Sequence, residues 1–103
     1  MPQLDVTSDE LPKYRDRRLL RFADGYRVRD FQRFEQQLKK RLAILEDAQS
    51  RDDLRRLPSN HFEALGGDRR GQCSVRVNQQ WRLCFEWPEG AKHPFNIELV
   101  DYH

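Results

Sequence analysis

Residues 72–87 of this chain read QCSVRVNQQWRLCFEW, and apolar and polar side chains alternate along most of the stretch. A period of two is typical of β-strands with one face on a core and the other in water. The apolar positions fall in two strands joined by residues 78–80: Cys73, Val75, Val77, Trp81, Leu83, Phe85 and Trp87. After a turn at residues 88–90, a third strand repeats the pattern with Phe95, Ile97 and Leu99. The sequence therefore predicts an antiparallel three-stranded meander.

The segment before this meander has helical periodicity instead. Asp30 is the expected N-cap, and apolar residues then recur at spacings of three and four: Phe31, Phe34, Leu38, Leu42 and Leu45. This pattern predicts a helix over residues 31–46. We expect it to lie across the sheet, although the near-heptad spacing also fits a helix that pairs with a second chain.

Shorter elements are expected on both sides of this helix. Residues 11–15 suit a short first strand, which Pro12 restricts to a sheet edge or a strand start. A short helix ended by Gly25 follows, with Leu19, Leu20, Phe22 and Ala23 on one face. Ser50, followed by Asp53, resembles the capping motif of one more helical turn. The fold class is therefore α+β: a short N-terminal strand and two helices packed on a C-terminal antiparallel sheet.

The composition fits a small single domain. The chain has 103 residues, of which 37% are hydrophobic and 35% are charged, with a net charge of +2. We expect residues 1–10, which are polar and acidic, to be a flexible extension and residues 11–103 to be one domain. All but four of the 19 basic residues are Arg, which suits phosphate or an acidic partner but equally a solvated surface.

The location of the protein is also predicted from its composition. No apolar run is long enough for a membrane span, and residues 1–30 are too charged for a signal peptide. We therefore expect a cytoplasmic protein with no membrane contact, in which Cys73 and Cys84 are free thiols. Two separate Cys without paired His make a poor metal site, so no metal or cofactor is expected.

Two features suggest chemistry on a phosphodiester. Residues 101–103 are Asp, Tyr and His, three side chains that can carry protons or contact phosphate. Residues 69–85 contain Arg69, Arg70, Arg76 and Arg82 and no acidic residue. Arg76 and Arg82 should lie near each other on the polar sheet face, where an anion between them would relieve their repulsion. Alternatively, they are solvated or pair with Glu86 and Glu98, and the tail is a frayed strand end.

Several motifs resemble one family. The stretches FEALGGDRRGQ (62–72), SVRVN (74–78), QWRLCF (80–85) and LVDYH (99–103) resemble HigB-type toxins of the RelE/ParE superfamily, from type II toxin–antitoxin systems. The resemblance implies a compact α+β toxin that cuts messenger RNA within the ribosome. It also implies cleavage without a metal, by attack of the ribose 2′-OH on the adjacent phosphate. A helix-turn-helix, HigA-like antitoxin would neutralise the toxin.

The same resemblance assigns roles to individual residues. His103 would act as base or acid, and Tyr102 would donate to the phosphate or stack on a base. Asp101 would orient His103 or take the 2′-proton. Arg82 would stabilise the transition state. The remaining arginines, Arg69, Arg70 and Arg76, would contact RNA or the ribosome.

The sequence departs from the family at two positions. Glu63 stands where better-known members have a catalytic His, and it could serve as the general base or be a solvated carboxylate. Gly66 stands where many members have Lys, which predicts a weaker enzyme. The alternatives to a nuclease are a toxin that acts only by docking, as in the ParE branch, an inactive homologue, or a stand-alone RNA-binding domain. The last is the weakest, because Trp81 and Trp87 lie in the apolar alternation where core packing is expected.

Overall fold

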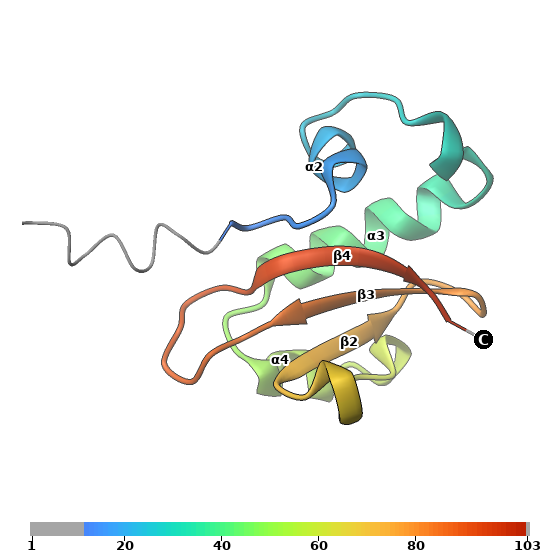
Figure 1. The fold of residues 1–103 in the computed structure, drawn as a ribbon. Helices are drawn as coiled ribbons and strands as arrows, with labels where there is room; N and C mark the ends of the chain where they lie inside the picture. The colour runs from blue at the N-terminus through green and yellow to red at the C-terminus, as the bar shows by residue number, and fades with distance from the viewer. Residues whose placement is uncertain (1–11, 103) are drawn as a thin grey trace, which may run out of the picture.

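A computed structural model describes residues 12–102 of the chain. Its helices are α2 (Arg17–Ala23), α3 (Glu35–Asp47) and α4 (Arg51–Arg56), with three 3₁₀ turns, η2 (Arg29–Phe34), η3 (Pro58–Asn60) and η4 (Gly67–Arg69). Its strands are β1 (Glu63–Ala64), β2 (Gln72–Arg76), β3 (Trp81–Glu86) and β4 (Phe95–Asp101). The strands form one sheet in the order β1-β2-β3-β4, and every neighbouring pair is antiparallel (Figure 1). The predicted meander is confirmed, and β1 adds a strand that the sequence did not predict.

The predicted first strand is a short parallel bridge on the free edge of β4. Tyr14 pairs with Ile97, and the amide of Arg15 donates to the Ile97 carbonyl at 2.9 Å. The carbonyl of Pro12 accepts from the Asn96 amide at 2.8 Å. Because proline has no N–H to donate, it is tolerated at this edge through its carbonyl alone.

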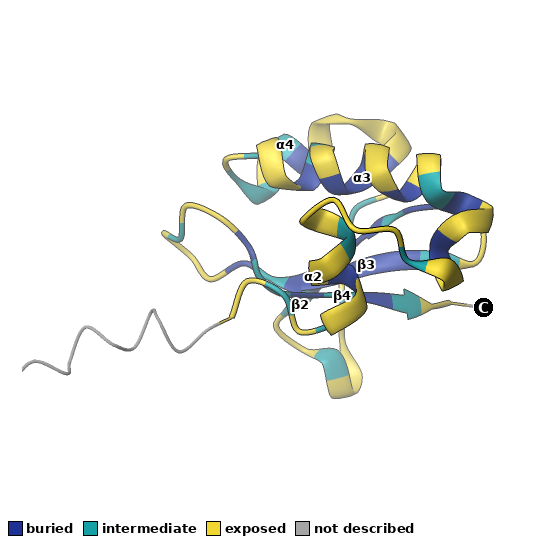
Figure 2. Cartoon of the chain, turned by 90° about the horizontal axis from the view of Figure 1, so that it is seen from above, coloured by how far each residue is buried: buried dark blue, intermediate teal, exposed yellow. Residues whose placement is uncertain are grey.

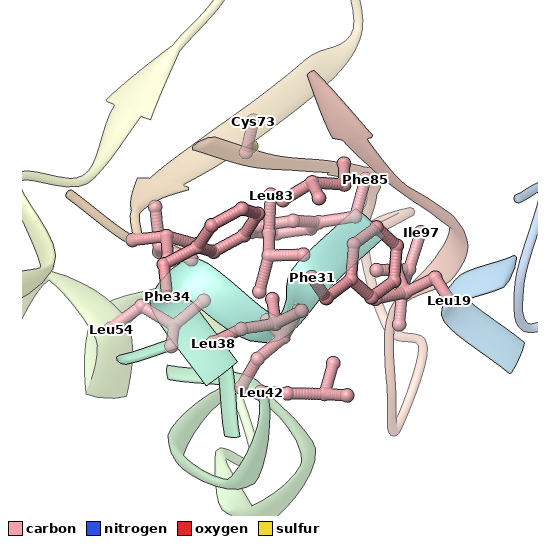
Figure 3. Close-up of a cluster of buried hydrophobic side chains, with 14 of the residues drawn as sticks. Leu19, Phe31, Phe34, Leu38, Leu42, Leu54, Cys73, Leu83, Phe85 and Ile97 are labelled. Carbon is pink, nitrogen blue, oxygen red and sulfur yellow. The ribbon is translucent and has the colours of Figure 1, made fainter. Parts of the chain in front are cut away.

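The helices and the sheet enclose the core between them. Helices α3 and α4 cover one face of the sheet, and η4 lies on the opposite side (Figure 2). All five residues of the predicted helix seam are at most 8% exposed: Phe31, Phe34, Leu38, Leu42 and Leu45. Figure 3 shows Leu38 and Phe31 gathered with Leu83 and Phe85 of β3. The seam therefore packs on the chain's own sheet, as expected, and is not left free for a partner helix.

Two predicted details of the helices are wrong. Asp30 is not an N-cap, because the chain enters the 3₁₀ turn η2 after Val28, and the Asp30 carboxylate instead pairs with Arg18 at 2.8 Å. Leu20 and Ala23 do not face the core, since α2 lies at the margin of the fold and buries only Leu19 completely, with Phe22 half-buried. A seven-residue helix at the edge of a layer has room for one buried turn only.

The predicted cap at Ser50 is confirmed. The Ser50 hydroxyl accepts from the amide of Asp53 at 3.2 Å, at the start of α4. The Asp53 carboxylate reaches back to the amide of Gln49 at 2.9 Å. The first bond satisfies an N–H group that the first turn of a helix cannot pair internally, and the second satisfies the amide just before the N-cap.

Both cysteines are buried free thiols. Cys73 is paired across the sheet with Phe85, and Cys84 with Ser74, so the register places the two thiols on opposite faces of the sheet. Within residues 12–102, no helix combines the length and the apolar character that crossing a membrane requires.

Candidate functional site

A row of polar side chains crosses the sheet on the face that α3 does not cover. The register joins Glu63 of β1 to Ser74 of β2, Ser74 to Cys84 of β3, and Cys84 to Glu98 of β4. Because directly paired residues point to the same side of a sheet, all four lie on this face. Ser74 and Cys84 are completely buried, whereas Glu63 is exposed at the sheet edge.

Arg82 is the central cation of this polar face. Its side chain is buried, at 8% exposure, and its Nε donates to the Ser74 hydroxyl at 2.8 Å. Its Nη2 donates to the backbone carbonyl of His61 and lies 3.7 Å from a carboxylate oxygen of Glu63. A guanidinium held by two hydrogen bonds and a nearby carboxylate has a fixed orientation, which a flexible surface arginine lacks.

The end of β4 brings Tyr102 to Arg82. The Arg82 guanidinium lies over the Tyr102 ring at 5.5 Å from the ring centroid, and Tyr102 is 37% exposed. Asp101 is paired with Trp81, so strand alternation places it on the opposite side of β4 from Tyr102. Its carboxylate accepts from the side-chain amide of Gln80 at 3.2 Å. His103 lies outside the described residues.

The three arginines expected to contact RNA differ in their surroundings. Arg69 on η4 donates to Glu98 at 3.0 Å and to Gln72 at 2.9 Å. The hydrogen bond to Glu98 raises the pKa of the Arg69 guanidinium, and the nearby Tyr102 acts in the same direction. Arg69 therefore lies on the same polar face as Arg82 and Tyr102.

The other two arginines, Arg70 and Arg76, make fewer side-chain contacts than Arg69. Arg70 is exposed. Arg76 is directly paired with Arg82 across the strands, as predicted, and its Nε donates to the backbone carbonyl of Asn78 at 3.2 Å. The repulsion between Arg76 and Arg82 is therefore relieved by separate acceptors, and the carboxylate next to Arg82 is Glu63, not Glu86 or Glu98.

Several groups that build the site were not among the predicted site residues. Ser74 and the carbonyl of His61 orient Arg82, and Glu98 orients Arg69. Strand alternation could have found Ser74 and Glu98, since both share the face of Arg82. Nothing local predicts the His61 carbonyl, which reaches Arg82 from a left-handed residue with φ of 44° outside the strands.

Two other features bear on the chemistry of the site. Burial raises the pKa of the Cys84 thiol, while Arg69 and Arg82 act in the opposite direction. Within the described part of the chain, no three His, Cys, Asp or Glu side chains gather as a metal site requires. A hollow of about 570 Å³ lies between α2 and α3, lined in part by Tyr26 and Lys39, and none of the predicted site residues lines it.

Comparison with known proteins identifies the family. The family described as RelE-like toxin of type II toxin-antitoxin system HigB matches residues 12–103. Toxin HigB-1 of Vibrio cholerae serotype O1 is 50% identical over 57 residues, which are 55% of this chain and 60% of that relative. The aligned region thus spans less than two thirds of the relative's length. The chain belongs to the RelE-like HigB toxins of type II toxin–antitoxin systems, a family that implies an antitoxin partner.

Proposed function

We propose that this toxin is a ribosome-dependent mRNA endonuclease that acts in the cytoplasm without a metal. The observation that carries the proposal is the fixed guanidinium of Arg82 on the sheet face opposite α3, with Tyr102 and Glu63 beside it. A toxin that acts only by docking has no need of a buried, oriented cation next to a phenol and a carboxylate. The helix-turn-helix antitoxin, the ribosome and mRNA are the partners of this proposal.

The proposed reaction has a defined course. A base takes the proton of the ribose 2′-OH, whose oxygen attacks the adjacent phosphorus while the bond to the 5′-oxygen breaks. The leaving 5′-oxygen takes a proton from an acid, so the products are a 2′,3′-cyclic phosphate and a 5′-hydroxyl end. The charge that builds up on the phosphate oxygens calls for preorganised donors.

The residues of the polar face suit these steps. Arg82 would bind the phosphate oxygens in the transition state, and the Tyr102 hydroxyl would add a donor. Glu63, whose side chain is 54% exposed, is accessible as the general base. His103 would be the acid, and Asp101, which lies on the other side of β4 from Tyr102, would orient it. Arg69, Arg70 and Arg76 would hold the flanking RNA backbone.

Expression without the antitoxin tests the proposal. Wild type should arrest growth and leave mRNA cut within translated regions, and Arg82→Ala or His103→Gln should relieve both effects. Arg33→Ala is the matched control, because Arg33 is an exposed arginine on η2, away from the polar sheet face. Growth arrest with intact mRNA, or arrest unchanged by the first two variants, would instead favour a toxin that acts only by docking.

A further inference from the structure

Arg41 is a buried cation on the long helix α3. It lies on α3 at 8% exposure, and no ion pair joins it to a carboxylate of residues 12–102. Its Nη1 donates to the Asn60 side-chain carbonyl at 2.6 Å and to the Ser59 hydroxyl at 3.4 Å. Its Nε is buried and has no hydrogen-bond partner among residues 12–102. Burying a guanidinium in this way is unfavourable, so the stability of the fold alone does not account for an arginine at this position.

The partner of Arg41 is itself the anchor of a short segment. Asn60 is completely buried, and its side-chain amide donates to the carbonyl of Leu54 at the end of α4 at 3.0 Å. Its backbone amide donates to the carbonyl of Leu57 at 3.0 Å. Asn60 therefore joins α3, α4 and η3 through one side chain.

The next residues lead directly to the polar sheet face. His61 has a left-handed backbone, with φ of 44°, which a residue with a side chain adopts only when its surroundings hold it. The carbonyl of His61 accepts from Arg82, and β1 begins two residues later at Glu63, 3.7 Å from the same guanidinium. One arginine from α3 and one from β3 thus hold the same segment at residues 59–63 from its two ends.

We propose that Arg41 is a positioning residue of the toxin, which through Asn60 fixes the segment that presents Glu63 and the His61 carbonyl to Arg82. The inference rests on the proposed nuclease function, because it assigns Arg41 to the same site. Arg41 itself touches neither RNA nor the reacting atoms. The planar guanidinium suits this role, because one nitrogen reaches two acceptors from a rigid group.

The test compares three variants of the full-length toxin on programmed ribosomes. Arg41→Met removes the charge and the donors while keeping much of the side-chain volume. Lys40→Met is the matched control, since Lys40 is the adjacent exposed cation on α3. The double variant Arg41→Met/Asn60→Leu removes both partners together, which provides a folded protein if the single variant is destabilised by the buried, unpaired side-chain oxygen of Asn60.

The expected result separates positioning from binding and from folding. A displacement of the catalytic group by about 1 Å can cost about 10²-fold in rate, so kcat should fall by about that factor in Arg41→Met while KM stays at the wild-type value. The folded double variant should show the same loss, and Lys40→Met should show none. Wild-type kcat in a folded Arg41→Met or double variant would overturn the inference, as would a loss confined to KM.

A second measurement does not depend on catalysis. The Nε–H of Arg82, which is bonded to Ser74, gives an NMR signal that reports whether the segment still holds the guanidinium. This signal should shift or broaden in Arg41→Met and stay unchanged in Lys40→Met. An unchanged signal in Arg41→Met overturns the positioning role, whereas failure of the nuclease proposal itself would appear as uncut mRNA with the wild-type toxin.

Discussion

At the scale of single residues, Gly66 allows a direct test of the family pattern. A Cβ at this position would meet nothing within 4 Å, and the backbone is not left-handed. The Lys of related toxins therefore fits. Because a charge-assisted contact to phosphate contributes roughly 1.5–3 kcal/mol, Gly66→Lys should raise the cleavage rate on ribosomes about tenfold or more. The neutral, similarly long Gly66→Gln should not, and equal rates in both variants would show that a phosphate contact at this position does not limit the rate.

The side chain of Arg82 shows how much of the site a single sequence can predict. Strand alternation correctly placed Arg82 beside Arg76 on the polar face. It did not predict that Arg82 is buried, because the groups that cover and bind it, Ser74 and the His61 carbonyl, come from other segments. Side-chain partners of this kind are fixed by tertiary packing, and the local pattern does not contain them.

The buried thiols predict a dependence of stability on alkaline pH. Burial raises the pKa of both Cys73 and Cys84 in the folded protein. The unfolded chain therefore releases these protons first as the pH rises above about 8.5, and the free energy of unfolding should fall by up to about 1.4 kcal/mol per pH unit for each thiol. Urea unfolding between about pH 7 and pH 10 measures this slope, which should be smaller in Cys84→Ala. An identical slope in that variant would contradict the assignment.

At the scale of elements, periodicity predicted the long helix seam and the three longer strands. It could not predict β1, because two residues are too short to show alternation. It also misjudged the start of the long helix, where the chain first makes the 3₁₀ turn η2 before α3 begins at Glu35. Helix periodicity of three and four does not separate a 3₁₀ turn from the α-helix that continues it.

The cap of α4 gives a prediction for a single element. Ser50→Ala removes the hydroxyl that accepts from the Asp53 amide, so it should lower the free energy of unfolding by about 1 kcal/mol. Ser50→Asp provides another oxygen acceptor at the same position and should retain most of the stability. Chemical denaturation measures both variants, and equal losses would mean that the hydroxyl is not the stabilising group.

At the scale of the whole molecule, the two faces of the sheet differ in the side chains that they carry. One face packs on α3 and α4 and supplies the core, and the other carries Arg82, Glu63, Arg69 and Tyr102. The predicted α+β fold, with helices on one side of an antiparallel sheet, is confirmed. Glu63 and Tyr102 leave the margin of the polar face exposed, which suits the proposed presentation of the substrate by the ribosome.

Under the proposed function, this exposed margin predicts a strong dependence on the ribosome. Exposed side chains alone provide little to orient a free RNA strand, and orientation contributes on the order of several kcal/mol to a reaction of this kind. The purified toxin should therefore cut a free message at least about 10³-fold more slowly than the same message on ribosomes. A gel-based time course measures both rates, and similar rates would contradict the proposed ribosome dependence.

The placement of the cysteines also has a practical consequence for labelling. Because its two native thiols are buried, one on each side of the sheet, the folded protein should be inert to maleimide dyes. A single cysteine introduced at Gln79, in the exposed turn between β2 and β3, would then take a fluorophore selectively. Docking of the toxin on a ribosome or an antitoxin could be followed in real time with the native sequence otherwise intact.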